Sequence, residues 1–429
     1  MLKSTYKKIV AVAAVLLSFL IAPAQNDISS PYSMYGVGLL SNVTSGAYDA
    51  MGKVGYAMQN PYLINFKNPA SYIAFDSLSF IGDVAFSIYS STLSTSVLSQ
   101  KATYARPGYF AFGLPVTKHW RTSAGVMPFS NLGYSISDSR TIENVGDVSY
   151  LYSGSGGLLQ VYWGNAFKLC KGLSLGLNAS YVFGNLTYAK SASIDGENFF
   201  NAMTSRTLDL DGIYLSAGLQ YFVTVKGQHK LGFGIVYENS AYIWARQTDF
   251  AYTYTTSASS PSDTARYEKS KGNLQLPQTI GGGFSYQYKD KLWVTADVSW
   301  QNWKRFHLST ETMRENFNDA MSYSVGIQFI PDATSSNYAK KIRLRIGARY
   351  TTGYINAATD GTYTPISDFS VSAGVGLPLK LFTSNSSIGI LFEYGSMGTH
   401  QNNLLKENYF RFSLHFTLQE KWYQRVKLD

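Results

Sequence analysis

The sequence predicts an all-β protein, a transmembrane antiparallel β-barrel of about 14 strands with an N-terminal hatch. Alternating apolar and polar residues recur from Leu78 almost to the C-terminus. Beyond the first residues, no stretch approaches roughly 18 consecutive apolar residues, so a membrane span would have to use strands. Charged residues are only 15% of the chain and aromatic residues are also 15%, which suits strands with one lipid-facing side.

Residues 1–24 are expected to form a cleaved signal peptide. Lysines begin the segment, an apolar stretch follows over residues 9–22, and a small-x-small cleavage pattern ends at Ala24. The apolar stretch is too short to span a bilayer comfortably, although an uncleaved anchor is the alternative. The single cysteine, Cys170, lies far from this point, so we expect no lipidation there.

Residues 25–77 are predicted to form the hatch. The segment is too polar for a core helix and too interrupted by Gly and Pro for a strand. It contains Ala50-Met51-Gly52 and later the run Asn68, Pro69, Ala70 and Ser71. Asn68 can cap exposed backbone groups and Pro69 fixes the turn before the first strand. We therefore expect these residues to lie inside the barrel.

The barrel strands are expected within residues 78–419. In residues 292–301, 342–350 and 410–419, one face is apolar and the other is polar along the whole segment. Many segments reach the roughly 9 to 11 residues that cross a bilayer at a tilt, and several carry aromatic residues at their ends. A soluble β-sandwich is the alternative, because local alternation alone does not exclude it.

The lengths of the connections favour the barrel. Short turns are expected at residues 117–119, 170–171, 226–229 and 289–291, and longer polar connections at residues 135–154, 191–207, 249–275, 304–317 and 353–366. Short periplasmic turns that alternate with long outer loops are typical of outer-membrane barrels, whereas a sandwich gives no reason for the alternation. Residues 420–429 would then form a periplasmic tail.

The pattern AMG…NPA resembles the N-terminal segment of FadL-type outer-membrane transporters, which carry hydrophobic molecules. Leu276-Pro277 also opens a glycine-rich strand that is followed by a tight turn and a strand containing Asp297 and ending near Trp303, as in the same family. The resemblance covers the mature chain. It implies a 14-stranded barrel, closed by a hatch, from which substrates leave sideways through a gap in the wall.

The resemblance places this lateral opening at the third strand, which here reads AGVMPFSNLGY. Pro128 has no backbone N–H and cannot complete a strand ladder, and Asn131 and Gly133 could satisfy or relax the freed backbone. A harmless β-bulge is the alternative.

Several ionisable residues fall on the polar, lumen-facing side of their strands. They are Arg343, Arg345, Arg349, Arg411 and His415. One interpretation is an interior ion-pair network that fills the barrel and holds the hatch. The other is that one or two of the arginines meet a substrate carboxylate.

The sequence offers no catalytic, cofactor-binding or metal-binding residues, and we expect no enzyme. It contains no G-x-S-x-G, no P-loop and no H-x-x-x-H pair. The net charge of +9 comes from dispersed Lys and Arg, so nucleic-acid binding is not expected. Anionic lipid head groups are partners that would equally explain the basic surface.

Together these observations predict a monomeric channel in the outer membrane of a Gram-negative, diderm bacterium, surrounded by outer-membrane lipid. It would take up hydrophobic small molecules such as long-chain fatty acids passively, by hatch-gated binding and lateral release. The tail after the last strand is similar to tails of Bacteroidetes-type outer-membrane proteins, and a divergent branch of the FadL-type family serves the type nine secretion system. The alternative is therefore a scaffold or shuttle barrel for secreted proteins, with a partner-binding outer surface and no continuous apolar tunnel.

Overall fold

The computed structural model describes residues 30–77, 79–143, 145–194, 200–255, 263–309, 317–359, 362–379 and 386–421. The predicted signal peptide, and the predicted tail beyond residue 421, lie outside these residues. In this described part of the chain, no helix is long and apolar enough to cross a membrane.

The wall is a closed antiparallel barrel of 14 strands, as the alternation predicted. The wall strands are β2 (Ser79–Ser94), β3 (Ser99–Pro115), β4 (Trp120–Ile142), β5 (Gly146–Cys170), β6 (Leu173–Ile194), β7 (Asn201–Val225), β8 (His229–Glu238) continued by β9 (Tyr242–Tyr254), β10 (Asp263–Gln275) continued by β11 (Thr279–Tyr288), β12 (Leu292–Gln301), β14 (Ala320–Phe329), β15 (Arg343–Thr351), β18 (Asp368–Pro378), β19 (Ser387–Gly398) and β20 (Lys406–Lys421). Pairing of β2 with β20 closes the ring.

Burial along the strands follows the predicted alternation. On β15, Leu344 and Ile346 are 45% and 53% exposed, whereas the neighbouring Arg345 is only 7% exposed. Successive side chains of a strand point to opposite faces, so the apolar residues form the outer, lipid-facing surface and the polar residues line the lumen. The polar face is therefore the interior of the molecule.

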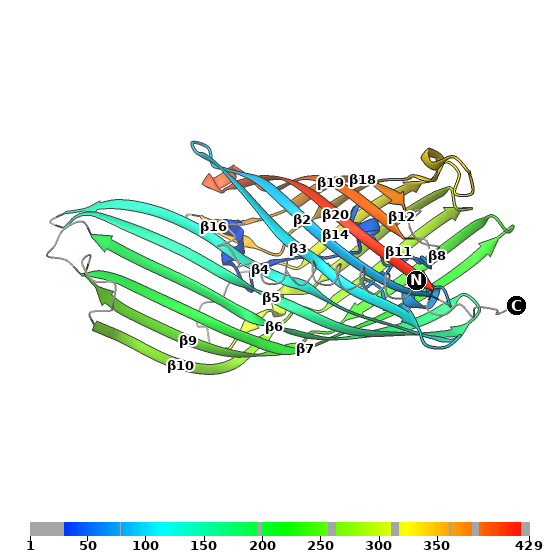
Figure 1. The fold of residues 1–429 in the computed structure, drawn as a ribbon. Coiled ribbons are helices and arrows are strands. Elements are labelled where there is room, and N and C mark those ends of the chain that lie inside the picture. Colours follow the sequence, from blue (N-terminus) through cyan, green and yellow to red (C-terminus); the bar gives the residue numbers. More distant parts are fainter. Residues whose placement is uncertain are drawn as a thin grey trace, which may run out of the picture.

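At the outer end of the barrel, the strands extend to very different lengths. β4 to β7, together with β9 and β10, extend well beyond the shorter strands β11 to β20 and form a curved sheet that projects from one side of the barrel (Figure 1). The prediction of long loops at residues 135–154, 191–207 and 249–275 is wrong, since most of these residues continue the strands. Their Ser- and Thr-rich composition concealed the strands, because those side chains also dominate loops.

The segment from residue 30 to residue 77 lies inside the barrel (Figure 1), and its two-residue strand β1 pairs with β4 of the wall. Its short elements are η1 (Pro31–Met34), β1 (Leu39–Leu40), α2 (Gly46–Asp49) and η2 (Pro69–Ala74). The remaining elements lie in the connections between wall strands: η3 (Trp303–Arg305), β13 (His307–Leu308), η4 (Tyr338–Lys341), β16 (Asn356–Thr359), β17 (Thr362–Pro365) and η5 (Gln401–Asn403).

Candidate functional site

The plug, defined here as residues 44–75, packs its backbone directly against glycines of the wall. Gly52 has φ +72°, and a Cβ placed on it would lie 2.5 Å from the backbone oxygen of Ala348. On the wall side, a Cβ on Gly347 would lie 2.1 Å from the carbonyl carbon of Met51. Only glycine allows such a close approach of two backbones. This contact explains the Ala50-Met51-Gly52 motif.

Asp297 on β12 holds the next turn of the plug. Its Oδ2 atom accepts hydrogen bonds from the backbone N–H groups of Gly55 (2.7 Å) and Tyr56 (3.0 Å). The Lys67 ammonium lies 3.4 Å from the same oxygen. A wall carboxylate thus satisfies two backbone donors that the irregular segment leaves without partners of its own.

Asn68 and the three residues after it lie buried inside the barrel. The Asn68 side chain accepts a hydrogen bond from the Ala70 N–H (3.1 Å) at the start of η2 and donates one to the Tyr56 carbonyl (2.7 Å). The Ser71 hydroxyl donates to the Asn65 carbonyl (2.9 Å). The run therefore ties two parts of the plug together and caps the helical turn that leads to β2.

Arg411 connects the plug to the opposite wall. Its Nη1 and Nη2 atoms each donate to a carboxylate oxygen of Asp49 at 2.8 Å, and its Nε donates to Glu393 at 2.6 Å. All three side chains are buried. A bidentate contact of this kind is directional as well as strong. Sequence reasoning missed Asp49 because it lies in the irregular segment, where no period assigns a side chain to a face.

Of the other predicted lumen residues, Arg349 and His415 line one cavity together with Arg411, whereas Arg343 and Arg345 lie outside it. Arg349 pairs with Asp368, and the Arg345 Nε donates to the Gln328 side chain at 2.8 Å. His415 packs against the plug, since a Cβ on Gly46 would lie 2.0 Å from its ring. Arg343 is half-buried near the end of the barrel that carries the short turns. The arrangement corresponds to an interior network more closely than to one substrate site.

The wall is interrupted between β3 and β4. Their ladder begins at Pro115 paired with Arg121 and ends at Phe110 paired with Val126, whereas β4 and β5 pair along their whole length. Pro128 lies just beyond the last pair, and the β4–β5 register shifts between Pro128 and Ser130. We call this separation of β3 from β4 the seam.

The strap, defined as residues 30–43, occupies the edge of β4 that β3 leaves free. β1 within the strap pairs with Ser130 and Asn131, and the Asn131 side chain donates to the Ser41 hydroxyl at 2.9 Å. Farther along, the Gly133 N–H donates to the Ser33 hydroxyl at 3.0 Å. The strap thereby satisfies backbone groups of β4 that β3 would otherwise pair. Leaving these groups without hydrogen-bond partners in a bilayer would be costly.

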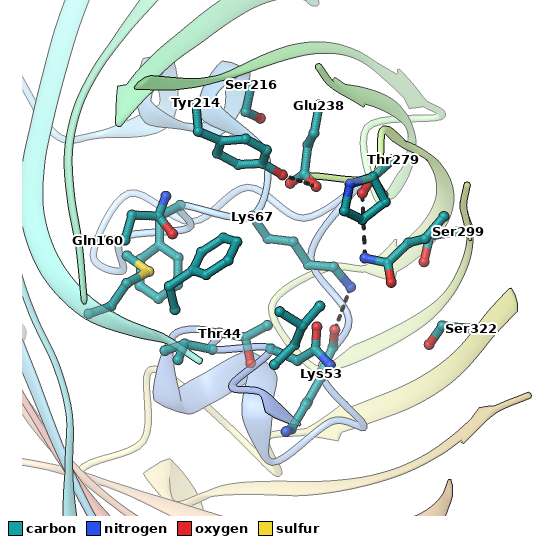
Figure 2. A pocket seen from close by; sticks show the side chains of 18 of the residues that line it. Thr44, Lys53, Lys67, Gln160, Tyr214, Ser216, Glu238, Thr279, Ser299 and Ser322 are labelled. Carbon is teal, nitrogen blue, oxygen red and sulfur yellow. Dashed lines mark hydrogen bonds between the residues drawn. The ribbon is translucent and has the colours of Figure 1, made fainter. Parts of the chain in front are cut away.

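Two larger cavities lie between plug and wall, and polar groups contribute to the lining of both. The first, of about 200 Å³, contains the Lys67 ammonium, which donates to the Lys53 carbonyl at 2.6 Å, and the Tyr214 hydroxyl, which donates to Glu238 at 2.6 Å (Figure 2). Burial lowers the pKa of Lys53 to about 8 and also lowers the pKa of Lys67.

The second cavity, of about 210 Å³, lies beside the seam. Its lining includes Pro128 and Asn131 at the seam together with Asp49 and Arg411 of the ion-pair network. A third space, of about 440 Å³, lies at the base of the projecting sheet, where Tyr152 and Lys190 are among its lining residues. Charged and hydroxyl groups are present in all three, beside apolar side chains such as Leu40 and Val43 in the first two.

The fold is similar to that of several solved structures of low sequence identity. A Pseudomonas aeruginosa FadL homologue is 12% identical with a TM-score of 0.58, covering 89% of this chain and 98% of that chain. The P. putida toluene transporter TodX is 14% identical with a TM-score of 0.58, covering 90% and 100%. The Ralstonia pickettii toluene transporter TbuX is 14% identical with a TM-score of 0.58, covering 89% and 99%. No curated protein matches the chain.

The family expected from the motifs is wrong. The family model that matches, over residues 5–429, is described as BamG and not as a FadL-type transporter. The plug contacts explain the error. The AMG and NPA motifs serve the close packing of plug against wall, so they indicate a plugged barrel of this design and not the family within it.

Proposed function

Because the chain belongs to the BamG family and forms an outer-membrane β-barrel, we propose that it is a plugged scaffold that binds a protein partner at its outer side. This is the alternative that the sequence left open. The observation that carries the proposal is the projecting sheet of β4 to β7, β9 and β10, which extends past the rest of the wall (Figure 1). A closed barrel does not need such an extension to stay in a membrane.

On β4 to β7, the outward positions of the projecting sheet near its tip are uncharged, whereas β10 presents Lys269 and Lys271 on the same face. Tyr134, Ile136 and Tyr152 pack inward against the core, so their neighbours along the strands point outward. The outward positions are Ser135, Ser137 and Ser139 on β4, Ser149, Leu151 and Ser153 on β5, Ala189, Ser191 and Ser193 on β6, and Met203 and Ser205 on β7. Small side chains without charge let another protein surface approach closely at little desolvation cost.

The contacts of the plug favour a scaffold role over transport through the barrel. Wall side chains on two separate strands, Asp297 on β12 and Arg411 on β20, hold it through backbone and carboxylate contacts. Opening a passage along the barrel axis would break these buried contacts, and breaking one buried ion pair by itself typically costs about 3–5 kcal/mol. The cavities that remain carry charged groups beside their apolar lining, such as Lys67 in the first and Arg411 in the second.

Site-specific photocrosslinking tests the scaffold. A photoreactive residue at Ser137 or Ser191 should give discrete protein adducts in whole cells, because these positions lie on the outward face of the projection. The same residue at Val298 or Ile346, which are 42% and 53% exposed on the wall, should give lipid adducts. The absence of any protein adduct from the projection, in cells where the barrel is folded, would contradict the proposal.

A second function is favoured by the seam. A wall whose ladder stops at Phe110 and Val126 offers a route between the second cavity and the bilayer, and the strap covers this route. The substrate would be a small hydrophobic or amphipathic molecule that leaves the barrel laterally, into the bilayer. A variant with Pro128→Val and Asn131→Val should slow its uptake, and unchanged uptake would contradict this route. Mass spectrometry of co-purified lipid would identify the substrate.

A further inference from the structure

Lysines are concentrated at the end of the barrel that carries the short turns. The described turns at this end carry exposed lysines, which are Lys118, Lys168, Lys171, Lys226, Lys289, Lys291 and Lys340. The exposed acids beside them, among described residues, are Asp290 and Asp332. Asp332 accepts hydrogen bonds from the N–H and hydroxyl of Thr334, at 3.0 and 2.8 Å, within its own turn. This end therefore has a strong excess of positive charge.

The opposite, outer end is different. There, Arg140 pairs with Asp138 at 2.9 Å and Arg266 with Glu268 at 2.6 Å, and the exposed lysines Lys101, Lys269, Lys271 and Lys304 lie among exposed acids that include Glu143, Asp147 and Asp263. The positive charge of the chain is thus not spread evenly over its two ends. Short turns mark the periplasmic side of an outer-membrane barrel, so the excess lies at the periplasmic rim.

The lysines lie next to lipid-facing aromatic residues. Phe167, Tyr221 and Phe329 point outward at the same end and are 41%, 43% and 37% exposed. The Lys291 ammonium lies 5.8 Å from the centre of the Phe329 ring. Outward aromatic residues mark the boundary between hydrocarbon and head groups. The ammonium groups therefore lie at the depth of the phosphates of the inner leaflet.

We propose that this lysine ring binds the phosphate groups of anionic phospholipids in the inner leaflet of the outer membrane. The ring is formed by the turns β3–β4, β5–β6, β7–β8, β11–β12 and β14–β15, so it follows the barrel circumference. A protein partner would contact one side, whereas a lipid annulus contacts every side. The distribution of the charge therefore favours lipid over an acidic protein.

Native mass spectrometry of the full chain in detergent, titrated with equal amounts of phosphatidylglycerol and phosphatidylcholine, tests the proposal. Wild-type protein should retain phosphatidylglycerol preferentially, by about fivefold for one lysine contact, and added salt should weaken the preference. Replacing Lys118, Lys171, Lys226 and Lys289 together with Gln should abolish it. The matched control replaces Lys101, Lys269, Lys271 and Lys304, exposed at the outer end, and should retain it.

Three outcomes would overturn the inference. In the first, both variants lose the preference equally, so that net charge and not position matters. In the second, millimolar inorganic phosphate displaces the phosphatidylglycerol, which would make free phosphate the ligand. In the third, the ring variant keeps its lipid preference but loses a crosslinked periplasmic protein. The ring substitutions leave the outer projection unchanged, because the substituted turns lie at the other end of the barrel.

Discussion

At the scale of single residues, Arg411 is the most consequential side chain of the interior. It is the shared partner of two buried carboxylates, Asp49 of the plug and Glu393 of β19. A buried pair adds little net stability over an apolar replacement of the whole set, but removing one member leaves charge without a partner. The role of Arg411 is therefore to fix where the plug sits.

Arg411→Met should lower the free energy of unfolding by about 3–5 kcal/mol, because two carboxylates then stay buried without their cation. Urea unfolding in detergent, followed by tryptophan fluorescence, measures the change. Arg246→Met is the control, since Arg246 forms an exposed pair with Asp211 at 3.0 Å and should change stability by less than about 1 kcal/mol. Equal effects of the two substitutions would refute the anchoring role.

Lys53 should make stability depend on pH. Burial lowers its pKa in the folded protein to about 8, below the ordinary value of 10.5. Between these values the unfolded chain holds the proton and the folded chain has released it, so the stability from this group rises as pH increases. Below pH 8 both states are protonated, and the penalty of burial is constant.

Lys53→Met should remove this rise and should stabilise the protein at neutral pH, where the charge is buried. The difference in unfolding free energy between wild type and variant, measured from neutral pH upward, is the quantity to follow. Lys304→Met, at an exposed position, serves as control. Parallel curves for wild type and Lys53→Met would show that the Lys53 ammonium is fully hydrated.

At the scale of elements, the seam and the strap form one unit. β3 leaves β4 after Val126, and the strap takes up pairing at Ser130 and Asn131. The sequence predicted an irregularity at Pro128, because proline breaks a ladder. It could not predict that the strap would supply the missing partner, since that pairing joins residues about 90 positions apart and leaves no local signal.

Deleting residues 26–75 should raise the conductance of the barrel in planar bilayers, because strap and plug fill the lumen. The control shortens the β4–β5 hairpin by replacing residues 137–150 with a tight turn, which lies outside the lumen and should leave conductance as it is. An unchanged conductance after the larger deletion would mean that the loops at the outer end, and not the plug, close the barrel.

At the scale of the whole molecule, the fold was predictable and the family was not. Alternation over residues 292–301 fixes which side chains face lipid, and it appears in the structure as β12. By contrast, the plug contacts of Asp49 and Gly347 depend on tertiary packing between distant segments. The projecting sheet was missed because Ser-rich strands have weak β propensity and resemble loops.

The complete barrel should require detergent in solution, since its wall presents residues such as Ile346 and Phe392 outward, at 53% and 46% exposure, and it should stay folded in dodecyl sulfate until it is heated. Unheated protein should migrate faster than heated protein in a dodecyl sulfate gel, because the closed barrel is more compact than the extended chain. Solubility of the mature chain as a monomer without detergent would contradict the membrane assignment.

The packing of plug against wall dictates an order of assembly. The plug touches β12 through Asp297, β15 through Gly347 and β20 through Arg411, and it is enclosed once β20 pairs with β2. Side-chain packing this close leaves no room for the plug to enter a finished cylinder. The plug must therefore be in place before β20 pairs with β2, so that the wall strands assemble around it and the last pairing closes the ring.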